Sequence, residues 1–261
     1  METKKNIYFA RTYRRLHIDI GRSLLFATLL IVPSIIFLIM NVNHITQMIS
    51  WLGVELLSKV IPADLIEVNT SQYSILNVVE YIELPTTLPT RTLIFWNLAI
   101  CLVIVIFMLF MKKTGRPIAI FFLFGTVIHI VSCIYFLFAG REFPYTLGIY
   151  SDIYLKQEIG IWITYVILAG LLVSFIGENG YIFKFSTYIT VMVYSIVFGT
   201  VRYILYLFIL YRFSALYMAL LFFVLGPMFD FSYFVAIYAI FVNKNIKEYE
   251  LGKKKGVWKW S

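Results

Sequence analysis

The stretch that decides the fold is Leu93–Met111, LIFWNLAICLVIVIFMLFM, in which no side chain is charged. At a rise of 1.5 Å per residue, a helix of this length covers nearly all of the roughly 30 Å hydrocarbon core of a bilayer. In lipid every backbone N–H and C=O needs a partner within the chain, which favours helices over open strands. Comparable apolar stretches lie at Leu24–Met40, Ile118–Phe138, Ile159–Ile176 and Tyr188–Tyr211, and a last one ends near Val242. The sequence therefore predicts an all-α membrane protein, a bundle of six transmembrane helices.

Composition and charge agree with a membrane protein and indicate its orientation. Hydrophobic residues make up 61% of the chain, charged residues make up 14%, and the formal net charge is +8. Of the 22 lysines and arginines, 16 lie before the first span, between the second and third, at Lys184, or after the last span. The positive-inside rule then predicts that both termini are cytoplasmic in a cell membrane. Topology and anionic lipid explain the basic charge, so we expect membrane lipids and other membrane or envelope proteins as partners, and no nucleic acid.

The chain is predicted to have three parts. Residues 1–22 form an amphipathic helix on the cytoplasmic surface, because apolar residues recur there at helical spacing between arginines. Residues 23–242 form the membrane domain, and residues 243–261 form a basic cytoplasmic tail. Within the membrane domain, residues 41–91 are predicted to be extracytoplasmic, with a surface helix over 49–60, strand-like composition over 65–84 and a proline-stiffened return over 84–91.

Arg202 and Asp230 are the charged residues inside the last two apolar stretches. An arginine at such a depth costs about 2.5–3.5 kcal/mol on insertion scales, so it should face a partner or a polar cavity. Gly226 and Pro227 predict a break in the final stretch, which leaves 215–225 as an outer or re-entrant piece and places Asp230 near the outer surface. Two interpretations of an Arg202–Asp230 pair stand side by side: an outward-facing functional site, or a structural ion pair between helices.

The loop before the fourth span adds Arg141, Glu142, Asp152 and Glu158 to the same outer face. Carboxylates beside an arginine can perform acid–base chemistry or bind a charged head group, although such a loop is also typical of solvated surface. His129 and Cys133 share a helix face, but two ligands make a poor zinc site, and a hydrogen-bonded buried histidine fits better. We predict no metal and no cofactor, and the sequence contains no nucleotide-binding or hydrolase motif.

Two stretches near the end of the chain stand out, Phe198–Leu205, FGTVRYIL, and Gly226–Phe231, GPMFDF. Together they resemble the C-terminal core of the exosortase/archaeosortase family. The family consists of multi-pass membrane transpeptidases of envelope protein sorting that use a Cys, an Arg and a His. Arg202 looks like the family's Arg, whereas Asp230 stands at the His position and Tyr150–Glu158 contains no cysteine. The resemblance thus implies a catalytically altered or non-catalytic component of envelope, exopolysaccharide or protein-sorting machinery. Ser151 as a substitute nucleophile lacks a visible base.

Two further functions remain open from the sequence. The six spans, the cytoplasmic ends and the basic amphipathic helix are similar to the permease subunits of ABC-2-type exporters, which would require a separate ATPase. The short segments Lys112–Pro117 and Gly177–Ser186 offer little room for an ATPase to dock. A lipid-processing enzyme that uses the outer carboxylates is the third hypothesis.

Overall fold

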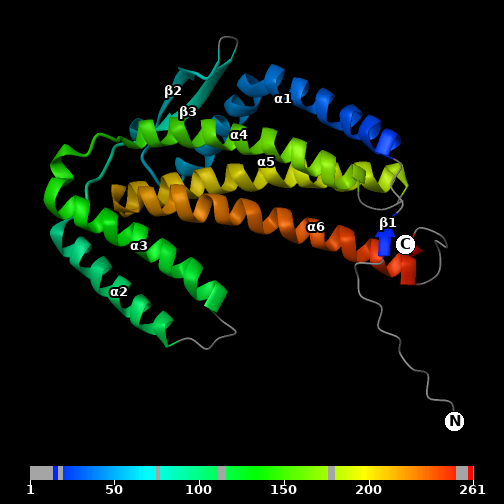
Figure 1. Ribbon diagram of the computed structural model, residues 1–261. Coiled ribbons are helices and arrows are strands. Elements are labelled where there is room, and N and C mark those ends of the chain that lie inside the picture. The colour runs from blue at the N-terminus through cyan, green and yellow to red at the C-terminus, as the bar shows by residue number, and fades with distance from the viewer. Residues whose placement is uncertain are drawn as a thin grey trace. The chain divides into compact units, whose positions relative to one another are not determined.

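Six long apolar helices make up most of the structure, a computed structural model of the chain (Figure 1). They are α1 (Ile20–Leu57), α2 (Arg91–Leu109), α3 (Arg116–Ala139), α4 (Leu147–Phe175), α5 (Tyr181–Arg212) and α6 (Gly226–Glu250). Each is, alone or with the turn beside it, long and apolar enough to cross a membrane, which confirms the predicted multi-pass, all-α architecture. The structure describes residues 14–16, 20–74, 77–110, 116–175, 180–250 and 258–260.

The chain forms two compact units. The first holds the described parts of residues 1–35, 164–193 and 234–261, and the second holds those of residues 36–163 and 194–233. In the first unit, β1 (Arg14–Leu16) pairs antiparallel with β4 (Trp258–Trp260). Most of the predicted amphipathic helix over 1–22 lies outside the described residues, and the part at Arg14–Leu16 is this strand. Gly170 of α4 lies against Ile31 of α1 and Tyr188 of α5, and the rings of Phe183 and Phe241 stack at 5.4 Å, so the helices of this unit pack closely.

Helix α1 is longer than the sequence predicted. The stretches 24–40 and 49–60 were expected to be a span and a separate surface helix, but α1 runs from the first into the second, ends at Leu57 and is about 57 Å long at 1.5 Å per residue. Polar side chains between the two stretches support this continuity. Asn41 and Thr46 each donate to the carbonyl four residues earlier, so they satisfy backbone groups of the helix and do not interrupt it.

A β-hairpin in the second unit packs between α1 and α5. Strands β2 (Glu67–Gln72) and β3 (Val78–Glu83) pair antiparallel, as the strand-like composition over 65–84 indicates. Ser50 of α1 donates to the Glu80 carbonyl at 3.1 Å, and the backbone N–H of Ile82 donates to the hydroxyl of Tyr203 in α5 at 3.0 Å. Gly53 lets the Ile82 side chain lie against α1, because a Cβ there would collide with it. The hairpin is thus fixed on both sides.

The final apolar run is not broken at Gly226. A short 3₁₀ turn, η5 (Ala215–Tyr217), leads into a π-helical segment, η6 (Leu220–Leu225), which continues directly into α6. The Gly226 N–H donates to the Leu221 carbonyl, five residues earlier. Pro227 has no N–H to donate, and a wider turn accommodates that loss without ending the helix. The predicted outer piece over 215–225 is therefore part of one long run.

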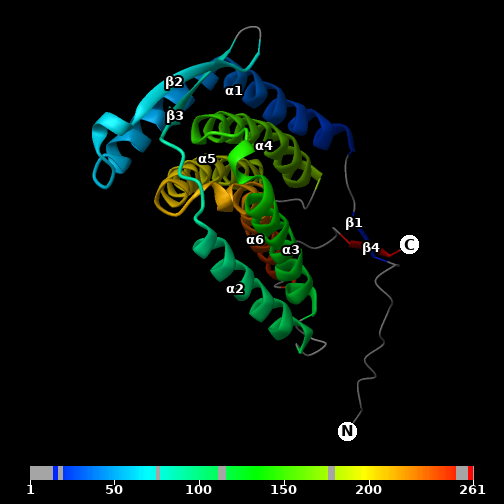
Figure 2. The same ribbon diagram turned by 90° about the vertical axis from the view of Figure 1, so that its left-hand side faces the viewer.

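Helices α2 and α3 lie side by side in the second unit (Figure 2). Thr90 caps α2, since its hydroxyl accepts from the Leu93 N–H. A polar contact between the two helices fixes their register: His129 Nε2 lies 3.0 Å from Asn97 Oδ1. Exposed apolar side chains, among them Phe95, Trp96 and Val103, cover the rest of α2, as suits a helix in contact with lipid.

Candidate functional site

Arg202 is the centre of a buried polar cluster formed by α4, α5 and α6 within the second unit. Its side chain is 3% exposed and donates from Nη2 to Asp230 Oδ2 at 2.8 Å. The same nitrogen donates to Glu158, Nη1 donates to the Gly226 carbonyl at 2.7 Å, and Nε donates to the hydroxyl of Tyr154. The structure therefore brings together the predicted pair and adds a second carboxylate. We call Arg202, Glu158 and Asp230 the charged cluster.

Helical spacing explains how the residues converge. Tyr150, Tyr154, Glu158 and Trp162 recur every four residues on one face of α4, and all four are buried. On α5, Gly199 and Arg202 are three residues apart and face the same side. A Cβ on Gly199 would lie 2.8 Å from Glu158 Oε2, so this glycine provides the space that the carboxylate occupies.

The two carboxylates outnumber the guanidinium. With all three groups ionised the charged cluster carries a formal charge of −1, and Glu158 and Asp230 are both 2% exposed. One oxygen of each carboxylate, Glu158 Oε2 and Asp230 Oδ1, has no hydrogen-bond partner among the described residues. The hydroxyl of Tyr206 and the indole N–H of Trp162 are buried and similarly unpartnered in that part of the chain. Buried polar atoms of this kind are costly unless a ligand, an ion or water satisfies them.

The guanidinium itself is already occupied by the protein. An arginine has five N–H donors, and four of those of Arg202 point to acceptors on two helices, α4 and α6. An anion would have only the remaining N–H of Nη1 unless it displaced one of these acceptors. Two buried carboxylate oxygens of the cluster are without a partner in the described chain, and such atoms suit a cation or a hydrogen-bond donor.

The remaining predicted site residues are not in the charged cluster. Asp152 forms an ion pair with Lys156 at 2.8 Å and accepts a hydrogen bond from Ser71 of the hairpin. Arg141 and Glu142 are exposed in a 3₁₀ turn, η4 (Gly140–Glu142), and no hydrogen bond or ion pair of the described chain joins them to Arg202. Of the loop residues proposed from sequence, the structure thus brings only Glu158 to the arginine.

His129 is hydrogen-bonded within the protein, as expected for a buried histidine. Asn97 Oδ1 lies 3.0 Å from His129 Nε2 and accepts a hydrogen bond from the hydroxyl of Tyr217, also at 3.0 Å. The rings of His129 and Tyr217 stack, with centroids 5.2 Å apart. Because an amide oxygen only accepts, Nε2 carries the proton. Cys101 and Cys133 are buried free thiols. Across the described residues no three His, Cys, Asp or Glu side chains gather as metal ligands.

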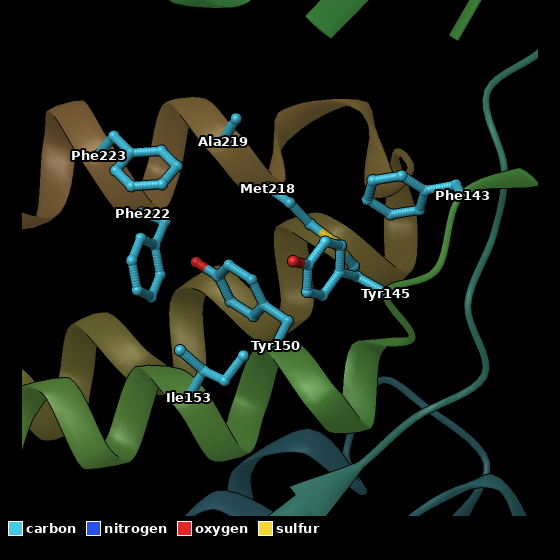
Figure 3. Close-up of a pocket in the computed structure, with 8 residues that line it drawn as sticks. All are labelled: Phe143, Tyr145, Tyr150, Ile153, Met218, Ala219, Phe222 and Phe223. Atoms are coloured by element: carbon cyan, nitrogen blue, oxygen red, sulfur yellow. The ribbon is translucent and has the colours of Figure 1, made fainter. Parts of the chain in front are cut away.

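A cavity of about 300 Å³ opens between the first turns of α4 and the segment that includes η6, and the sequence did not reveal it. Five of its eight lining residues are aromatic, and Figure 3 shows the rings of Tyr145 and Tyr150 lying between Phe222 and Phe143. Its lining residues are Phe143, Tyr145, Tyr150, Ile153, Met218, Ala219, Phe222 and Phe223. We call this the aromatic pocket. Tyr150 links it to the charged cluster, because its ring stacks on Tyr154 at 5.8 Å.

Comparison of the chain with known protein families, curated proteins and solved structures found no match.

Proposed function

We propose that the chain is a non-catalytic, exosortase-like component of cell-envelope, exopolysaccharide or protein-sorting machinery, and that it binds its ligand at the charged cluster. In this proposal it resides in the cell membrane with both termini in the cytoplasm. Its partners are membrane lipids and other envelope proteins. The clustering of basic residues at alternate loops and both ends supports the orientation.

One observation carries the binding role: four of the five N–H donors of Arg202 are engaged by protein acceptors, whereas Glu158 and Asp230 each have one oxygen without a partner among the described residues. A transpeptidase arginine should be available to a developing oxyanion, and the acceptors around this one leave it a single N–H. Carboxylates without a nucleophile or a neighbouring base are suited to holding a ligand.

The geometry around Ser151 also favours a non-catalytic role. Its hydroxyl is buried and hydrogen-bonded to the hydroxyl of Tyr203 at 2.6 Å, and Tyr203 in turn accepts from the backbone of the hairpin. An activated serine needs a base within hydrogen-bonding distance, such as a histidine or a carboxylate. Here the neighbour is a tyrosine that serves the fold.

The test is complementation of cells that lack the chain. We expect Glu158→Gln and Asp230→Asn to preserve protein abundance in the membrane while surface exopolysaccharide or displayed sorted protein is lost. Glu142→Gln is the matched control, because that carboxylate is exposed and outside the charged cluster. If both cluster variants retain full surface output, the binding role is wrong. If their abundance and output fall together, and neutralising Arg202 in the same chain restores both, the cluster is a structural ion pair.

A further inference from the structure

The two strands of the hairpin differ in what lies along their outer edges. Three alternate residues of β3 direct their backbone N–H groups away from β2, and side chains of α1 and α5 accept from all three. The pairs are Val78 with Asn43 at 2.9 Å, Glu80 with Thr46 at 3.3 Å and Ile82 with Tyr203 at 3.0 Å. Ser50 adds a hydrogen bond to the carbonyl of Glu80. The outer edge of β3 is therefore closed by the protein itself.

The outer edge of β2 is open in the described chain. In an antiparallel pair the backbone groups of every second residue face the partner strand, and those of the others face outward. Ile82 donates outward and is paired with Val68, so Val68, Thr70 and Gln72 are the outward-facing residues of β2. No backbone N–H or C=O of these three is hydrogen-bonded to another described residue, and their side chains are exposed. We call these three residues the open edge.

Strand β2 also lacks the features that usually protect an open edge. Natural edge strands avoid unwanted pairing through proline, lysine, a bulge or a covering segment. The sequence of β2, EVNTSQ, contains neither proline nor lysine, and its six residues pair with β3 without a bulge. Ser71 donates to Asp152 of α4, and Asn69 donates to Glu83 at 2.6 Å, so the inward-facing residues hold the strand in place. An accessible strand held in this way is a template for an added strand.

The hairpin carries acidic charge that no ion pair of the described chain neutralises. Its two strands contain Glu67, Glu80 and Glu83 but no lysine or arginine, and none of the three glutamates is in an ion pair with a described residue. Glu67 lies directly opposite Glu83, and like charges in this position destabilise a sheet. Burial raises the pKa of Tyr81, and the negative charges of Glu83 and Asp152 raise it further. A basic residue beside Glu67 would relieve the repulsion.

We propose that the open edge binds an extended, basic segment of a partner protein, which adds to the hairpin as a third strand. Backbone hydrogen bonds to the open edge hold the segment, and the glutamates select it. One basic side chain beside Glu67 and another beside Thr70, from which a long side chain can reach Glu80 on the next strand, match the acidic charge on both faces of the hairpin. A second copy of the chain fits less well, because its hairpin would bring three more glutamates.

This interface goes beyond the function proposed for the charged cluster. None of the residues of the open edge belongs to that cluster, and peptide binding to the hairpin does not require Glu158, Arg202 or Asp230. Failure of the interface would therefore leave the proposed function untouched.

Binding of two matched peptides to the purified full chain in an uncharged maltoside detergent tests the proposal. The peptides are TVKTVKTV and TVETVETV, each amidated and labelled with the same uncharged fluorophore, and fluorescence anisotropy measures their affinities. The two lysines, three residues apart, lie on opposite faces of a strand, as the spacing of Glu67 and Thr70 requires. We expect the basic peptide to bind about tenfold more tightly, because two favourable cross-strand charge pairs replace two unfavourable ones. Equal affinities, or binding of neither peptide, would overturn the proposal.

Proline variants locate the binding at the open edge. Thr70→Pro removes an outward N–H, and its ring obstructs the edge, while the hydrogen bonds to β3 remain. We expect it to abolish binding of the basic peptide with little change in melting temperature, whereas Thr70→Val keeps the N–H and is the matched control. If Thr70→Pro unfolds the chain, Gln72→Pro makes the same test at the end of the strand. Undiminished binding in a folded proline variant would refute the site.

Two further measurements test the charge and the occupant. Glu67→Gln combined with Glu80→Gln should remove most of the preference for the basic peptide, and an unchanged preference would show that the glutamates do not select the segment. Light scattering of the chain without peptide measures its oligomeric state. A dimer that Thr70→Pro converts to a monomer would assign the open edge to a second copy and overturn the basic partner.

Discussion

Removing the positive charge from the charged cluster should destabilise the protein more than neutralising an exposed charge does. In Arg202→Met, the carboxylates of Glu158 and Asp230 would stay buried, with no other cation of the described chain in contact with them. Breaking a buried ion pair by removing one partner costs about 3–5 kcal/mol. For chains of this length each kcal/mol lowers the melting temperature by about 2–4 °C, so we expect a fall of about 6–20 °C.

The matched variant neutralises the whole cluster. Combining Arg202→Met with Glu158→Gln and Asp230→Asn removes both the positive charge and the repulsion, so the triple variant should recover at least half of the lost stability. Thermal unfolding in detergent, followed by tryptophan fluorescence, measures the change, because Trp162 is buried on the same face of α4. Arg141→Met is the control, since Arg141 is exposed and should change stability by less than about 0.5 kcal/mol. The reasoning fails if Arg202→Met melts within about 2 °C of the unmodified chain, or if the triple variant is no more stable than the single one.

Three further outcomes follow from the packing. Gly199→Ala should lower the melting temperature despite the better helix propensity of alanine, about 1 kcal/mol, because the new methyl group lies 2.8 Å from a Glu158 oxygen. Gly160→Ala, with open space around it, should not lower it, and equal effects of the two would contradict the site geometry. Tyr203→Phe removes the hydroxyl that accepts from the Ile82 N–H of strand β3, which should cost about 1–3 kcal/mol of stability. Hydrogen exchange of the β3 amides should therefore accelerate. Unchanged exchange would show that other contacts hold the hairpin. Asn97→Leu leaves His129 and the hydroxyl of Tyr217 without their shared acceptor, so α2 should separate from α3 more readily. Proteolysis between the two helices should become faster. Unaltered proteolysis would refute that role of Asn97.

The sequence predicted the helices well because hydropathy and length are local properties. Six spans follow from runs of apolar residues that are continuous along the chain, and the structure has six helices of that kind among its described residues. The boundaries were less accurate. Polar residues after Met40 and the Gly226–Pro227 pair were interpreted as ends of helices. In the structure the side chains of Asn41 and Thr46 donate to carbonyls of the continuing helix, and a π-helical turn continues the final run.

The partners of Arg202 show where sequence reasoning stopped. Asp230 was predicted from the cost of a charge in lipid, which requires a counter-charge of similar depth. Glu158 was proposed for the same outer face but as part of the loop before the fourth span, because a position at the edge of an apolar stretch does not reveal whether it is inside or outside the membrane domain. The four-residue spacing of Tyr150, Tyr154, Glu158 and Trp162 was the available signal.

The sequence by itself determined that this protein consists of apolar helices and that an arginine and an aspartate among them had to be compensated. The tertiary structure alone decided which helix faces meet, and so which second carboxylate joins the arginine and which rings enclose the aromatic pocket. In water the buried face of a helix is marked by its hydrophobicity. In lipid the buried and the exposed faces are both apolar, so only packing between residues distant in the chain distinguishes them.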